Sequence, residues 1–128
     1  VLALRWSERA WTTSVGPATR LQWGAAHLGT LIELAPGDAA RIEQVASQLF
    51  TEAAQDPSAF YERSARALQR AGARLVDWGR DAPRTATLAR LRAQLAPVCA
   101  ALATADGQRA TCQGLLQPGA KAPAAADS

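Results

Sequence analysis

AFYERSARALQRAGARLVDWG, residues 59–79, is the segment that decides the fold of this chain. At about 100° per residue, its side chains sort onto two faces of a helix. The apolar face consists of Tyr61, Ala65, Leu68, Gly72, Leu75, Val76 and Gly79. The opposite face carries Arg63, Arg66, Arg70 and Arg74. Because a helix with one apolar face requires other helices to cover it, the segment predicts a helical bundle.

Helix caps and helix breakers divide the rest of the chain into further helical segments. Asp38 follows Pro36-Gly37 and is placed to cap a helix, and Asp56 with Pro57 at the next position gives the same signal. Gly16-Pro17 interrupts the first pattern, where we expect either one bent helix or two collinear pieces. The expected helices span residues 2–13, 18–34, 39–55, 57–79, 85–102 and 108–116.

The connections between these segments are short, which makes consecutive helices antiparallel neighbours. The predicted fold is therefore all-α. It is an up-down antiparallel four-helix bundle with a kinked or split first helix and a short C-terminal helical hairpin. Leucines at a regular three-four spacing after residue 85 are typical of a bundle seam. Residues 1–116 form the predicted domain, and residues 117–128, which contain no core-forming side chains, are a predicted disordered Ala/Pro tail or linker.

The two cysteines, Cys99 and Cys112, flank a predicted turn at Asp106-Gly107. In a helical hairpin these positions face each other, and a disulfide bond there would close a loop of about 14 residues and stabilise the fold by roughly 3 kcal/mol. Such a bond indicates an oxidising compartment. The alternative is a pair of buried free thiols in a cytosolic protein. We predict the disulfide.

His27 is the only histidine, and with Arg20 and Trp23 it forms a candidate patch for a small ligand or a protein partner. These residues lie on a face of their helix that differs from the face needed for the core. Together they offer a flat apolar wall, a hydrogen-bond donor and a charge. The alternative is that the first helix covers this face with Trp6 and Trp11.

The sequence carries no pattern typical of catalysis or of cofactor binding. A catalytic His27 would need a nucleophile and an orienting acid that the sequence does not mark. Tetrahedral zinc takes four ligands at clustered spacing, which are not available here. We therefore predict no enzyme, no metal site and no cofactor.

The basic face of Arg63, Arg66, Arg70 and Arg74 is a second candidate site, for phosphates of nucleic acid or of anionic lipid. It lacks the interleaved aromatic residues of a single-strand binder. A net charge of +3 is also too small to require a nucleic-acid partner, which we do not expect. The alternative interpretation is an ordinary solvated helix face.

The first residues, VLALRW, are typical either of an amphipathic helix or of the end of a membrane anchor that precedes residue 1. With the predicted disulfide, they favour an extracytoplasmic location, in the periplasm or on the secreted side of a bacterial membrane. The leading hypothesis is a non-enzymatic helical-bundle domain that serves either as the sensory part of a membrane receptor or as an accessory partner-binding subunit. The alternatives are an Arg-striped module for an anionic surface and a cytosolic helical adaptor. A homodimer stays open.

Overall fold

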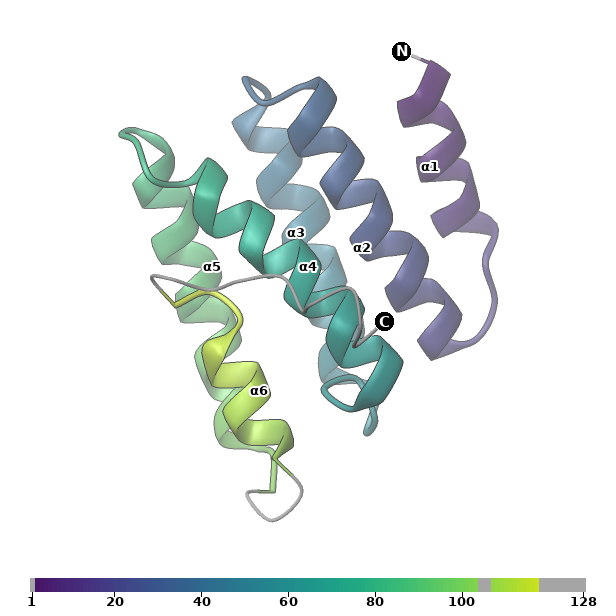
Figure 1. Cartoon of the computed structure of the whole chain (residues 1–128), viewed down its shortest axis with the longest axis vertical. Helices are drawn as coiled ribbons and strands as arrows, with labels where there is room; N and C mark the ends of the chain where they lie inside the picture. Colours follow the sequence, from purple (N-terminus) through teal and green to yellow (C-terminus); the bar gives the residue numbers. More distant parts are fainter. Residues whose placement is uncertain (1, 104–106, 118–128) are drawn as a thin grey trace.

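The computed structural model describes residues 2–103 and 107–117, and all the regular structure in this part of the chain is helical (Figure 1). The helices are α1 (Leu2–Thr13), α2 (Pro17–Leu34), α3 (Ala39–Ala54), α4 (Glu62–Trp78), α5 (Arg84–Ala100) and α6 (Gln108–Gly114). The all-α prediction is therefore confirmed. None of these helices has the length and apolar character that crossing a bilayer requires.

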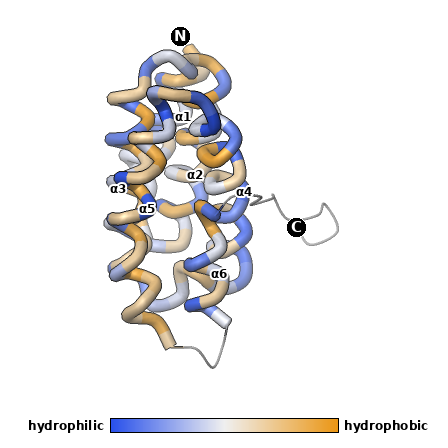
Figure 2. Tube along the Cα trace, turned by 90° about the vertical axis from the view of Figure 1, so that its left-hand side faces the viewer, coloured by the Kyte–Doolittle hydropathy of each residue, from blue (hydrophilic) through white to orange (hydrophobic). Residues whose placement is uncertain are grey.

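Helix α2 lies at the centre of the molecule and packs against α1, α3 and α4. Helix α5 packs against α3 and α6, and less closely against α4. Consecutive helices run in opposite directions (Figure 1). Figure 2 shows α3 and α5 on one side of the molecule and α4 and α6 on the other, with α2 between them.

The neighbours of α3 and α4 differ from the prediction. These two helices follow each other in the chain, yet α3 packs beside α5, and α4 packs beside α2. The connection at residues 55–61 passes from one side of the bundle to the other and buries Ala59 and Phe60 on the way. The prediction that consecutive helices are neighbours is therefore wrong for α3 and α4.

The expected bent or collinear first helix is wrong. Helix α1 folds back along α2 as an antiparallel neighbour, and Leu4 and Trp11 are its buried residues (Figure 1). Gly16 has a φ of 92°, a conformation that glycine adopts without steric cost, and Pro17 then begins α2. The break was therefore recognised, but it reverses the chain.

The start of α4 also requires a correction. The Asp56 carboxylate accepts a hydrogen bond of 2.9 Å from the backbone N–H of Ser58, so it closes a turn and does not cap the helix. Tyr61 is extended, with φ −131° and ψ 142°, and α4 begins after it at Glu62. Because Tyr61 is 50% exposed, its predicted place on the apolar face is wrong.

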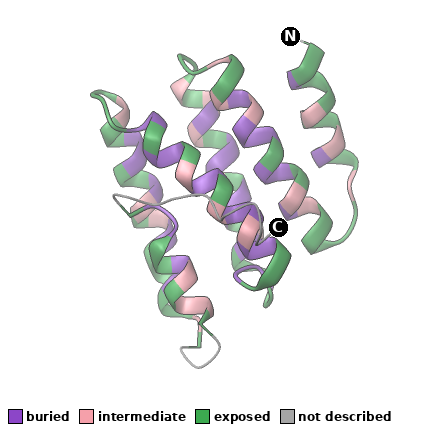
Figure 3. Ribbon diagram, viewed as in Figure 1, coloured by how far each residue is buried: buried purple, intermediate pink, exposed green. Residues whose placement is uncertain are grey.

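The other predicted apolar positions of α4 are buried, and Figure 3 shows the buried faces of the helices turned toward one another. Asp38 caps α3 as predicted, since its carboxylate accepts a hydrogen bond from the backbone N–H of Arg41. Asp81 makes no such bond at the start of α5. Proline at position 97 lies inside α5, which continues to Ala100.

The C-terminal helical hairpin is confirmed. Cys99 of α5 and Cys112 of α6 form a disulfide bond, with their Cα atoms 5.3 Å apart. Leu115 and Leu116 after α6 are buried. Asp106 of the predicted turn and residues 118–128 of the predicted tail lie outside the described residues.

Candidate functional site

His27 of α2 lies fully buried beneath α1. Its ring nitrogen Nδ1 is 2.6 Å from the Ser7 hydroxyl of α1, and the hydroxyl also bonds the carbonyl oxygen of Leu4. The indole ring of Trp11, one turn further along α1, lies 5.9 Å from the imidazole between ring centroids. The alternative, that the first helix covers this face, therefore describes His27 and Trp11 correctly.

Arg20 of α2 connects three helices, because its side chain contacts both α1 and α3. Its guanidinium makes a bidentate ion pair with Glu52 of α3, at 2.7 and 3.0 Å, and donates to the backbone carbonyls of Trp11 and Ser14. The hydrogen bonds from Arg20 hold the pKa of Glu52 below its usual value, although partial burial acts in the opposite direction. A residue with these partners has little capacity left for a ligand.

Trp23 is 47% exposed. The predicted patch is therefore divided. Arg20 and His27 are engaged with α1 and α3, while Trp23 stays on the surface. Trp6, which was expected to help cover this face, is 66% exposed.

A groove runs between α1 and α3 and has part of α2 as its floor. It has a volume of about 490 Å³, and its lining includes His27 below, Trp11 and Val45 as apolar walls, and Arg41 and Glu8 at the edge. The Arg41 guanidinium donates to the Glu8 carboxylate at 2.7 Å. This groove brings together residues that the sequence did not connect.

The second ring nitrogen of His27, Nε2, has no hydrogen-bond partner among the described residues. The nearest carboxylate oxygen, Oε2 of Glu8, is 3.9 Å away, which is beyond hydrogen-bonding distance. Burial lowers the pKa of His27, Glu8 opposes this shift, and Arg41 adds to it. The neutral imidazole is therefore favoured at neutral pH.

Ser7, His27 and Glu8 combine a hydroxyl, an imidazole and a carboxylate, as hydrolases do. The geometry favours a structural role. The imidazole is fully buried, and Glu8 lies too far away to orient it. Ser7 lies in the middle of α1, where the neighbouring N–H groups bond to helix carbonyls and are not directed at an oxyanion. The Ser7–His27 contact thus ties α1 to α2.

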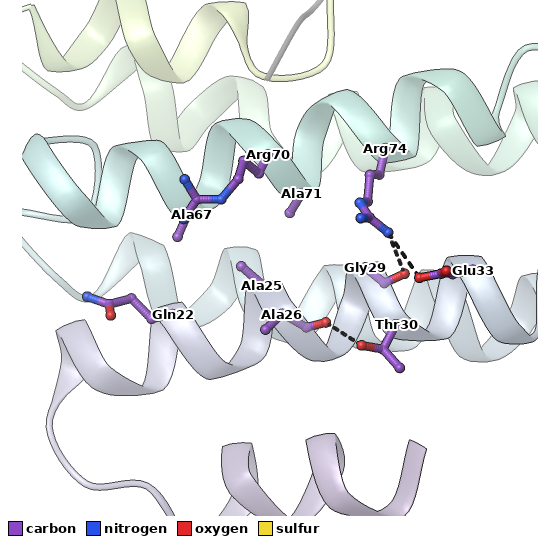
Figure 4. Close-up of a pocket in the computed structure, with 10 residues that line it drawn as sticks. All are labelled: Gln22, Ala25, Ala26, Gly29, Thr30, Glu33, Ala67, Arg70, Ala71 and Arg74. Carbon is purple, nitrogen blue, oxygen red and sulfur yellow. Dashed lines mark hydrogen bonds and ion pairs between the residues drawn. The ribbon is translucent and has the colours of Figure 1, made fainter. Parts of the chain in front are cut away.

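The basic face of α4 points away from the core, as predicted. Arg63, Arg70 and Arg74 are exposed and Arg66 is half-buried. Arg70 and Arg74 border a second cavity, of about 270 Å³, between α4 and α2 (Figure 4). Arg74 donates to the carbonyl of Gly29 at 3.1 Å.

Among the described residues, no three His, Cys, Asp or Glu side chains lie close enough together to hold a metal ion. Ser7, Glu8 and Arg41 were not predicted as site residues, because their contributions depend on the reversal of α1 at Gly16. Gly16, directly before Pro17, was the feature of the sequence that could have indicated this reversal. Comparisons of the chain with protein-family models, with curated proteins and with solved structures found no match.

Proposed function

We propose that this chain is a non-enzymatic binding domain of an extracytoplasmic compartment, and that a small polar molecule binds in the groove between α1 and α3. The observation that carries this proposal is the fully buried His27, whose Nε2 borders the groove without a protein partner. A buried polar group left unpaired costs about 1–3 kcal/mol. Because Nε2 is not exposed to solvent in this structure, a ligand must first displace the half-exposed Glu8 side chain, whose Oε2 atom is 3.9 Å away. A ligand that then bonds to Nε2 would recover that free energy.

The groove supports this proposal in size and in chemistry. Its volume of about 490 Å³ falls within the range of roughly 300–1,000 Å³ that is typical of small-molecule sites. Trp11 supplies a flat apolar wall, and the Glu8–Arg41 pair at the edge supplies both signs of charge. A polar molecule with an apolar or aromatic part would match this combination.

The Cys99–Cys112 disulfide supports the extracytoplasmic part of the proposal, because such bonds persist in oxidising compartments. In such a place, a ligand-binding bundle fits the sensory part of a membrane receptor. An accessory subunit that binds a partner protein fits the same compartment, and the groove favours the sensory role.

Nuclear magnetic resonance of the single imidazole provides the test. We expect at least one compound in a panel of small acids, amines and amino acids to shift the Nε2 resonance of His27. Gln48→Ala, which changes the groove wall on α3, should lower the affinity of the protein for that compound, while Trp23→Ala should leave this affinity unchanged. If no compound moves this resonance, or if Trp23→Ala has the same effect as Gln48→Ala, the groove is not the site.

A further inference from the structure

The cavity between α2 and α4 has a different character from the groove over His27. Its floor is made of small side chains from both helices, among them Ala25, Ala67 and Ala71, which are nearly fully buried. Arg70 and Arg74 stand along the α4 edge, and Glu33 stands on the α2 edge (Figure 4). Because α2 and α4 run in the same direction, the cavity forms a trough along the two helices (Figure 1).

The α4 edge of this trough carries positive charge that the described residues do not neutralise. No carboxylate among them lies within ion-pairing distance of Arg63, Arg66 or Arg70. Arg74 lies 3.8 Å from Glu33, with both side chains more than half exposed. The four guanidinium groups extend over three turns of α4, about 16 Å along its axis.

Trp23 adds an apolar element beside the trough. Ala26, three residues later on α2, lines the trough and is exposed. Residues three apart on a helix are neighbours on its surface, so the half-exposed Trp23 lies next to the trough. Tryptophan and arginine are the residues most enriched among those that dominate the free energy of protein–protein binding.

We infer that the trough between α2 and α4, with its Arg63–Arg74 edge and Trp23, is a docking surface for an acidic amphipathic helix of a partner protein. The small floor residues allow the partner helix to approach closely, and its carboxylates pair with the arginines one helical turn apart. Trp23 packs against an apolar side chain of the same partner helix. This site is separate from the proposed ligand groove.

The same surface fits a bilayer or a nucleic acid less well. A flat bilayer would meet the arginine edge but would not reach the alanine floor of a concave trough. Single-strand binders also place aromatic rings between their basic residues, and the four arginines of α4 have none between them.

Fluorescence anisotropy with a labelled synthetic probe tests the inference. The probe is an alanine-based helical peptide with Glu at three-four spacing and one Leu beside that face, and its matched control carries Lys in place of each Glu. We expect the Glu peptide to bind, with an affinity that falls as salt is added, and the Lys peptide not to bind. Arg70→Glu should weaken binding about tenfold or more. Arg5→Glu, an equal charge change on exposed α1, should have a much smaller effect.

Two neutral variants separate docking in the trough from attraction to charge alone. Ala26→Leu fills the trough at an exposed position, so it should abolish peptide binding, while Ala89→Leu at an exposed site on α5 should not. Equal effects of these two substitutions, or binding of the Lys peptide, would overturn the inference. The inference would also be overturned if the protein does not bind the Glu peptide but does bind phosphatidylserine vesicles or duplex DNA, and if Arg70→Glu abolishes that binding. Trp23→Ala should lower the affinity for the Glu peptide but leave the affinity for ligands of the His27 groove unchanged. The two proposals can therefore fail separately.

Discussion

The contact between α4 and the end of α6 offers a sharp test of the packing. Gly72 is buried in the middle of α4, and a Cβ atom at this position would lie 2.5 Å from the backbone carbonyl oxygen of Leu115. Carbon–oxygen contacts normally begin at about 3.3 Å. Gly72→Ala therefore requires roughly 0.8 Å of extra separation. Because the obstacle is backbone, a side-chain rotamer change cannot provide it.

The magnitude follows from two opposing effects. Alanine improves the helix by about 1 kcal/mol relative to glycine. Overpacking costs typically 1–3 kcal/mol, and a rigid backbone contact belongs at the upper end of that range. Displacing this segment would also loosen the burial of Leu115 and Leu116. We expect Gly72→Ala to lower the free energy of unfolding by about 2 kcal/mol.

Gly29→Ala in α2 is the matched control. Its Cβ would lie 3.4 Å from the Cδ atom of Arg74, an ordinary contact with a flexible side chain. This variant should gain roughly 0.5–1 kcal/mol from helix propensity. Urea denaturation followed by circular dichroism measures both values. If Gly72→Ala stabilises the protein as Gly29→Ala does, the close approach of α4 and the segment after α6 is refuted.

Three further predictions concern the core, the buried histidine and the disulfide. Leu91→Ala should cost about 2–5 kcal/mol in urea melts because Leu91 is buried in α5, whereas Arg66→Ala should change stability by less than about 0.5 kcal/mol; equal costs would contradict the assignment of faces. Since burial lowers the pKa of His27, the unfolded chain takes up a proton first, so stability should fall as pH drops below about 6.5, and His27→Gln should remove this part of the slope. Replacing Cys99 and Cys112 by alanine should cost about 3 kcal/mol, and a reductant should then have no further effect on the melting temperature.

Most of the helices could be predicted because their signals are local. Helical periodicity located the buried face of α4, and Asp38 marked the start of α3. The spacing of Cys99 and Cys112 about a turn indicated the disulfide. The start of α4 was misjudged because Asp56 and Pro57 are equally suited to a turn, and only packing of the connection selects between the two.

The candidate sites were less predictable. The sequence placed Arg20, Trp23 and His27 on one face, but it did not show that α1 folds back over part of that face. Glu52 carries no local signal of its partner, yet it pairs with Arg20 across 32 residues of sequence. Such partners become visible only when the neighbours of each helix are known.

The sequence alone determined which segments are helical and, for most of them, which face is apolar, because these properties depend on residues within a few turns of each other. Only the tertiary structure decided that α4 packs beside α2 and α3 beside α5. Several apolar faces of similar size could have paired, and a local pattern does not rank them. That choice between helix faces placed His27 under the α1–α3 groove and Arg70 at the edge of the α2–α4 trough, because each site lies between helices whose pairing is set by long-range packing.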